Sequence, residues 1–269
     1  MFNLDLCIEP LFPGLNSSEK IIKIASSGFK AIEFWFWDHE FDGVNLTPRP
    51  KDIDEISSIV SDRDITVNNI VVNAPDGSIG GSLTNINDKS KYLARLEETI
   101  SIAKKLRCSK MITCTGNIIE GVPIESQKDS ILQILSAAAE MAKQEGITLL
   151  LEALNSTIDH PGYYLTSTRE GFEIIRTVGS PNLKLLYDVY HMQIMEGNLI
   201  NTILANIEDI GHFHMANLPG RIELYDGEIN YKKILESIDA AGYNGYYGLE
   251  YWPSVDTEKS LVETLQYLQ

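Results

Sequence analysis

The sequence predicts a (β/α)₈ barrel, an α/β fold of the TIM-barrel type. Short runs rich in Val, Ile, Tyr and Phe alternate eight times with longer stretches of helical periodicity along the 269 residues. Eight β–α units with right-handed crossovers close into a barrel in preference to an open sheet. A doubly wound sheet is the alternative, but the first predicted strand is not followed by the glycine-rich turn that would hold a dinucleotide phosphate.

Each element has its own signal in the sequence. The predicted strands are 2–9, 31–37, 65–73, 110–116, 147–154, 183–190, 210–216 and 245–251. The predicted helices lie near 18–27, 50–63, 89–106, 126–145, 168–178, 199–208 and 231–241, with a last one from about 256 to the C-terminus. Gly28, Gly146, Gly179 and Gly242 stand where left-handed helix stops are expected, and Ser126 and Thr166 are the expected N-caps.

Composition narrows the classes of protein. No Pro/Gly/Ser-rich linker divides residues 1–269, so a single domain is expected. The formal net charge of −16 disfavours nucleic acid and anionic membrane surfaces as partners, although acidic surfaces also serve simple solubility. The sequence shows neither an apolar run of about 18 residues nor a signal-peptide pattern. Three cysteines without a CxxC pair suit reduced thiols, so a cytoplasmic location is expected.

Four side chains stand near the ends of apolar runs in the second half of the chain. They are Glu152 in LLLEAL, Asp188 in KLLYDVYH, His214 in GHFHMAN and Glu250 in YYGLEYW. On successive parallel strands of one barrel they converge at its mouth, where barrel enzymes place their chemistry. Any one of the carboxylates alone fits a structural salt bridge equally well. Together, three carboxylates and one imidazole predict a site for one divalent metal ion, Mn²⁺ or Mg²⁺ and possibly Co²⁺, with Zn²⁺ less suited.

Other residues are expected to border this site. His191 follows Asp188 by three positions and is expected beyond the metal ligands, where the alternative is a satisfied core histidine. Arg221, in the turn LPGR, offers a fork for substrate oxygens, and the alternative is a loop arginine paired with Glu223.

Two further segments have open interpretations. The stretch 73–88, NAPDGSIGGSLTNIND, has the composition of a mobile flap or of an ordinary surface loop. The aromatic pair Trp35 and Trp37 fits an apolar wall beneath such a flap or, more commonly, packing within the barrel.

The region from about 147 to 254 resembles the hydroxypyruvate isomerase branch of the xylose-isomerase-like barrel superfamily. The resemblance is carried by LLLEALN, HPGYYLTST, LLYDVYHMQIMEGN, HFHMANLPGR, GEINY and GLEYWP, and more weakly by GFKAIEFWF with Glu33. It implies a single divalent metal held by Glu152, Asp188, His214 and Glu250, with His191 and Arg221 contacting the substrate.

The implied reaction is a proton transfer next to a carbonyl. The metal would bind the carbonyl and hydroxyl oxygens of a small hydroxy-ketone or hydroxy-aldehyde and stabilise an enediolate, while Glu152 and Glu250 move the proton. Two glutamates at one metal support isomerisation or epimerisation, so the sequence does not decide between them. The expected partner is a small-molecule substrate, and a homo-oligomer is possible.

The sequence departs from the hydroxypyruvate isomerase pattern where specificity is set. His214 and Asn217 stand where that branch typically has Gln and Asp, and His214 is more similar to the ketose 3-epimerases of the superfamily, which act on tagatose, psicose or ribulose. A ketose 3-epimerase is therefore the alternative. The related DNA-repair nucleases of AP-endonuclease type are a remote one, because they need extra histidines and this chain has five.

Two other functions are less consistent with the sequence. A non-catalytic sugar-binding barrel would tend to lose one of the paired glutamates, and both Glu152 and Glu250 are present. A two-metal isomerase that shifts a hydride would need a lysine beside the site, but Lys184 begins its predicted strand at the opposite end of the barrel.

Overall fold

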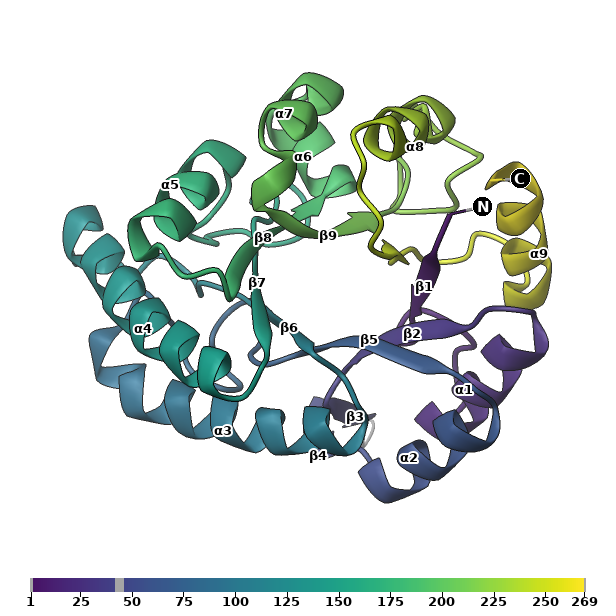
Figure 1. Ribbon diagram of the computed structural model, residues 1–269, viewed down its shortest axis with the longest axis horizontal. Helices are drawn as coiled ribbons and strands as arrows, with labels where there is room; N and C mark the ends of the chain where they lie inside the picture. Colours follow the sequence, from purple (N-terminus) through teal and green to yellow (C-terminus); the bar gives the residue numbers. More distant parts are fainter. Residues whose placement is uncertain (1, 42–45, 269) are drawn as a thin grey trace.

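The computed structural model describes residues 2–41 and 46–268 and has a closed parallel barrel at its centre (Figure 1). Around the barrel the strand order is β1-β10-β9-β8-β7-β6-β5-β2. The strands are β1 (Leu4–Cys7), β2 (Ala31–Trp35), β5 (Thr66–Val71), β6 (Lys110–Thr113), β7 (Thr148–Glu152), β8 (Leu183–Asp188), β9 (Ile210–Met215) and β10 (Tyr247–Leu249). The predicted (β/α)₈ barrel is confirmed.

Helices surround the barrel and cover its outer face (Figure 1). They are α1 (Ser17–Ser26), α2 (Ile53–Asp62), α3 (Lys89–Lys105), α4 (Ile124–Gln144), α5 (Thr168–Val178), α6 (Val189–Met195), α7 (Leu199–Ala205), α8 (Tyr231–Ala240) and α9 (Thr257–Leu268), with 3₁₀ turns at Ile86–Asp88 and Ile207–Asp209. In α5, Phe172 and Ile175 are buried on one face, and an apolar face of this kind holds a helix to a sheet. The expected helix stops at glycines 28, 146, 179 and 242 all have positive φ.

Two elements differ from the prediction. A two-stranded antiparallel sheet, β3 (Trp37–Phe41) with β4 (Leu46–Pro50), follows β2, and α2 therefore begins at Ile53 and not at residue 50. Pro48 and Pro50 keep this segment extended, because the residue before a proline avoids the helical region. Helix α6 begins at Val189, within the predicted strand 183–190, because the Asp188 side chain caps it by accepting from the backbone N–H of His191.

The two predicted N-caps are displaced. Ser126 lies inside α4, whose N-cap is Pro123, a residue with a fixed backbone angle suited to the start of a helix. Thr166 precedes the true N-cap of α5, Ser167, whose side chain accepts from the backbone N–H of Glu170. Both errors are one to three residues long, the usual uncertainty of helix ends.

The loop 73–88 is anchored to the end of β6. The amide of Asn73 donates to the carbonyl groups of Gly81 and Cys114, at 3.0 and 2.9 Å. The backbone N–H of Leu83 donates to the carbonyl of Thr115 at 2.8 Å. These bonds fix both ends of the loop beside the barrel mouth.

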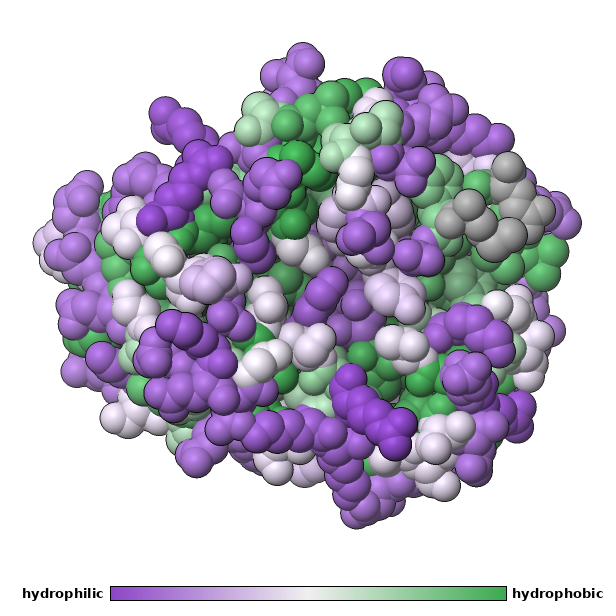
Figure 2. Space-filling view, viewed as in Figure 1, coloured by the Kyte–Doolittle hydropathy of each residue, from purple (hydrophilic) through white to green (hydrophobic). Residues whose placement is uncertain are grey.

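The surface and the cysteines agree with the composition. Hydrophilic residues predominate on the side of the molecule drawn in Figure 2, with apolar residues scattered among them. Within the described residues, no helix is both long and apolar enough to cross a membrane. The three cysteines are buried free thiols.

Candidate active site

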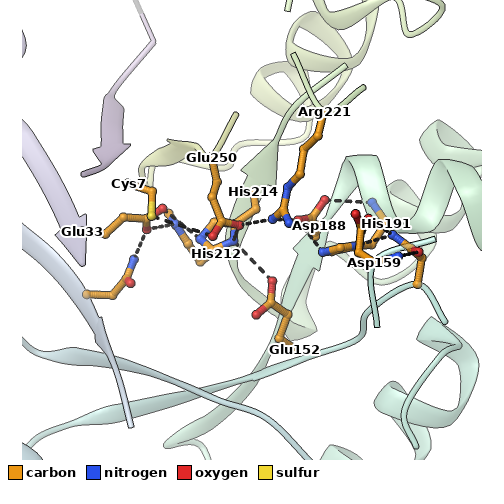
Figure 3. A network of polar contacts seen from close by, with 12 residues as sticks. Cys7, Glu33, Glu152, Asp159, Asp188, His191, His212, His214, Arg221 and Glu250 are labelled. Carbon is orange, nitrogen blue, oxygen red and sulfur yellow. Dashed lines mark hydrogen bonds and ion pairs between the residues drawn. The ribbon is translucent and has the colours of Figure 1, made fainter. Parts of the chain in front are cut away.

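The barrel brings the four predicted side chains together at one end. Glu152 and Asp188 are the last residues of β7 and β8, His214 is the last but one of β9, and Glu250 directly follows β10. One ligand atom from each residue lies within 4.8 Å of the others. Figure 3 shows the group converging from neighbouring strands, as the positions of the four residues in the sequence predicted.

His214 lies at the centre of this cluster. Its Nδ1 atom is 3.3 Å from Oε1 of Glu152 and 3.2 Å from Oε2 of Glu250, and its Nε2 atom is 3.0 Å from Oε1 of Glu33 (Figure 3). Burial lowers the pKa of His214, but the charges of Glu33 and Glu250 outweigh it and raise that pKa well above its ordinary value. The carboxylates therefore surround a position that favours positive charge.

The two glutamates have different partners. Nη2 of Arg221 lies 2.6 Å from Oε2 of Glu250. Burial raises the pKa of Glu250, but Arg221 and His214 outweigh burial and lower it to about 2. Glu152 lacks the arginine contact, and burial raises the pKa of its carboxyl group. Glu250 is thus a fixed carboxylate, while Glu152 is the less restrained of the two.

Asp188 belongs to the cluster and also caps helix α6. Its Oδ1 atom accepts from the backbone N–H of His191 at 3.0 Å, and its Oδ2 atom lies 4.0 Å from Nη2 of Arg221. Burial raises the pKa of Asp188 to about 7 despite the nearby arginine. Burial disfavours the ionised form of this carboxyl group, and a cation close to it would stabilise that form.

The donor set fits a divalent metal ion. Three carboxylates and one imidazole, all buried or nearly so, are the ligand types of Mn²⁺, Mg²⁺ and related ions. Nδ1 of His214 is buried, faces two carboxylates and has no hydrogen-bond partner within the described part of the chain. A cation at the centre of the cluster would satisfy this nitrogen and the surrounding negative charge together.

Arg221 and His191 both border the cluster, as predicted. Arg221 adopts a positive φ of 57° in its turn, and its guanidinium lies 5.3 Å from the ring centre of Tyr190. Its partner is Glu250, because Glu223 instead accepts from the backbone N–H and the hydroxyl of Ser254. Fully buried His191 has its Nε2 atom 3.6 Å from Oδ2 of Asp188. Burial lowers the pKa of His191 well below its ordinary value, and the positive Arg221 lowers it further.

A cavity of about 260 Å³ opens above the cluster. Glu152, His214 and Glu250 of the cluster, together with His191 and Arg221, contribute polar surface to it, and Trp35, Val71, Ile112 and Trp252 contribute apolar surface. Trp35 therefore lines the cavity. Trp37 is only 3% exposed and packs against the Trp35 ring, with the two ring centres 5.3 Å apart. The expected apolar wall therefore describes Trp35, and the expected packing within the protein describes Trp37.

Sequence reasoning missed the polar layer beneath the cluster. Oε2 of Glu33 bonds to Nε2 of His212 at 3.0 Å and to the amide of Asn69 at 2.5 Å. Asp5 is also fully buried there, and burial raises the pKa of its carboxyl group well above the ordinary value. The available signal was the alternation in HFH, which places His212 and His214 on the same face of β9.

A closed (β/α)₈ barrel with polar groups at the C-terminal ends of its strands is the arrangement found in TIM-barrel enzymes. The chain belongs to the xylose isomerase-like TIM barrel family, whose model matches residues 21–269.

Two named relatives agree with this family. The chain is 31% identical to a hydroxypyruvate isomerase of Escherichia coli over 265 residues, which is 97% of each chain. It is 40% identical to a 2-oxo-tetronate isomerase of Cupriavidus necator over 137 residues, 51% of this chain and 52% of the relative. These relatives confirm the prediction of an enzyme with isomerase activity.

The solved structures support the fold alone. An AP endonuclease of family 2 from Brucella melitensis matches with a TM-score of 0.87 at 24% identity, covering 99% of each chain. An L-ribulose 3-epimerase matches with a TM-score of 0.75 at 24% identity, covering 99% of this chain and 86% of that one.

Proposed function

We propose that this protein is a divalent-metal-dependent isomerase that interconverts a small hydroxy-ketone and the corresponding hydroxy-aldehyde, with 2-oxo acids as the substrate class. The observation that carries the proposal is the buried cluster of Glu152, Asp188, His214 and Glu250 at the barrel mouth. The names of the hydroxypyruvate and 2-oxo-tetronate isomerases support this substrate class.

The same four residues would hold the metal, which we expect to be Mn²⁺ or Mg²⁺, with Co²⁺ as a substitute. When bound, such an ion supplies Lewis-acid stabilisation of negative charge on substrate oxygens. Oxygen-rich sites of this kind favour hard ions, and the single imidazole also admits Co²⁺.

Glu152 is the group we assign to proton removal. The carbon-bound proton next to the carbonyl must pass to a base within hydrogen-bond reach. Glu250 is engaged by Arg221 at 2.6 Å, whereas the ion pair that Glu152 forms is with His214. Glu152 is therefore the more available acceptor, and it can return the proton to the neighbouring carbon on the same face.

Arg221 and His191 would bind and orient the substrate. The guanidinium of Arg221 carries a permanent charge at the edge of the cavity and can hold a carboxylate through two hydrogen bonds. Fully buried His191 lines the same cavity next to Asp188, where it can donate to an oxygen that gains charge. The apolar surface of Trp35 and Trp252 would limit the entry of water.

Ketose 3-epimerisation is the second candidate. His214 favours it, because the sequence resemblance to the epimerases rests on a histidine at this ligand position. Epimerisation needs an acid and a base on opposite faces of the enediolate, so Glu250 would have to exchange protons as well as Glu152.

The test is a metal-dependence experiment with a substrate panel. Protein depleted by prolonged chelation should lose activity and metal content, and Mn²⁺, Mg²⁺ or Co²⁺ should restore activity. Metal-loaded protein is then assayed with hydroxypyruvate, four-carbon 2-oxo acids, tagatose, psicose and ribulose. Turnover of the oxo acids supports the proposal, and turnover of ketoses alone would move the assignment to an epimerase. Full activity in metal-free protein would overturn the metal-dependent mechanism.

A further inference from the structure

Asn155, three residues beyond Glu152, contacts His191 in the wall of the cavity. Its Nδ2 atom lies 2.6 Å from Nδ1 of the His191 ring, and both side chains are fully buried. Nε2 of the same ring is buried and has no hydrogen-bond partner among the described residues. Figure 3 shows His191 beside Asp188 and Asp159, on the side of the cluster away from Glu33.

The orientation of the Asn155 amide is fixed by its other bonds. Its Oδ1 atom accepts from the backbone N–H groups of Ile158 and Asp159, each at 3.0 Å. Its Nδ2 atom donates to Oδ2 of Asp159 at 2.6 Å. A flipped amide would place its NH₂ group against two N–H donors and its oxygen against a carboxylate, losing all three bonds. The second N–H of the amide therefore faces His191.

This orientation determines where the proton of His191 lies. Nδ1 faces an N–H donor, so it must accept and cannot carry a proton. A neutral ring then has its proton on Nε2, the nitrogen without a partner. Oδ2 of Asp188 lies 3.6 Å from Nε2, beyond hydrogen-bond length, so this donor remains available to an oxygen in the cavity.

We infer that Asn155 is a positioning residue that holds His191 as the neutral Nε2–H tautomer, aimed at a substrate oxygen. His191 then acts as a hydrogen-bond donor and never as the base that removes the substrate proton. This role deepens the proposed function and rests on it. A donor that strengthens as charge develops on oxygen should influence kcat more than KM.

The first test measures the tautomer of His191 in the wild-type protein. Long-range ¹H–¹⁵N correlation spectra of protein labelled with ¹⁵N-histidine distinguish the two neutral tautomers and the charged ring, and a His191→Gln sample identifies the resonances. The inference expects a protonated Nε2 and an unprotonated Nδ1 in His191, with or without added Mg²⁺. A protonated Nδ1 in the wild-type protein would overturn it.

The second test replaces the amide by an acceptor. Asn155→Asp presents a carboxylate oxygen to Nδ1, so the spectrum should show Nδ1 protonated, and kcat should fall about 10-fold or more with KM changed less than threefold. The matched control is Asn182→Asp, whose amide donates to the carbonyl of Ile147 away from the site. The control should leave the His191 spectrum and kcat unchanged.

The outcomes separate this inference from the proposed function. An Asn155→Asp protein with unchanged Nδ1 and unchanged kcat would overturn the role of Asn155 and leave the isomerase proposal intact. A wild-type protein that binds no metal would overturn the proposed function, while its His191 spectrum would still report the tautomer. If Asn155→Asp does not fold, the wild-type spectrum alone decides.

Discussion

Gly248 of β10 is paired with His214 of β9 in the barrel wall, and its lack of a side chain leaves the space that the His214 ring occupies. A Cβ atom at position 248 would lie 2.8 Å from Cδ2 of His214. It would also lie 2.8 Å from Oε1 of Glu33 and from Nε2 of His212. Contacts this short would force the polar groups beneath the cluster apart.

Gly248→Ala should therefore weaken metal binding. Displacing the His214 ring from its position should lower the affinity for Mn²⁺ by about 10-fold or more, and overpacking should cost about 1–3 kcal/mol of stability. Calorimetric titration and thermal unfolding measure the two effects. Gly14→Ala is the control, since its Cβ would meet no heavy atom of the described residues within 4 Å apart from its chain neighbours, and its φ of +88° gives backbone strain alone. Equal affinity in both variants would contradict this role of Gly248.

Glu33→Gln tests the carboxylate that faces His214 from below. Oε1 of Glu33 and Nε2 of His214 lie 3.0 Å apart, and neither has a hydrogen-bond partner elsewhere in the described residues. A carboxylate behind a ligating imidazole orients the ring and increases its basicity, so the variant should bind metal about 10–100-fold more weakly. Glu98→Gln, on the exposed surface, is the control. If both variants bind the metal as tightly as the parent protein, the role assigned to Glu33 is wrong.

Arg221→Ala should separate the two candidate substrate classes. Loss of a charge-assisted fork of roughly 3 kcal/mol should raise KM for 2-oxo acids by about 10²-fold, because their carboxylate loses its anchor. Steady-state kinetics with an oxo acid and with a neutral ketose measure the effect. An equal change for both substrates would show that Arg221 does not bind a carboxylate.

The thiol of Cys108 should be inert in the folded protein. Burial raises the pKa of Cys108 to about 12, so at pH 8 roughly one thiol in 10⁴ is the reactive thiolate, and this fraction rises as pH rises toward the pKa. All three cysteines are buried, so Ellman's reagent at pH 8 should react with them slowly in native protein and quickly in urea. Rapid reaction of Cys108 in native protein would show that this part of the core is open.

The sequence was sufficient to predict the four cluster residues for a simple physical reason. In parallel strands of one barrel, the C-terminal ends lie on the same side, so an acidic residue or a histidine at the end of each apolar run must face the others. The same rule did not identify Glu33 and His212, because they sit among apolar residues within β2 and β9. Their partners lie on strands far apart in the sequence, and only the closed barrel brings them together.

The sequence pattern gave a wrong strand end at Asp188, a residue that has two roles. Asp188 ends β8 and also caps α6, so the β-branched and aromatic residues of DVYH looked like a continued strand. The role of Asn155 was not predicted from the sequence, because its amide is oriented by bonds that form only after the turn 155–159 has folded.

The central claim is that the reaction proceeds by proton transfer through a glutamate at the barrel mouth, and turnover in D₂O tests it most directly. A proton held by Glu152 can exchange with water before it returns, so the product should contain deuterium on the carbon that carried the carbonyl of the substrate. Deuterium on the carbon next to that carbonyl would instead indicate epimerisation. Glu152→Gln keeps the size of the side chain but removes the base, so it should lose at least about 10²-fold in rate. Unlabelled product from an active enzyme would contradict the account, because a hydride moves between carbons without contact with solvent.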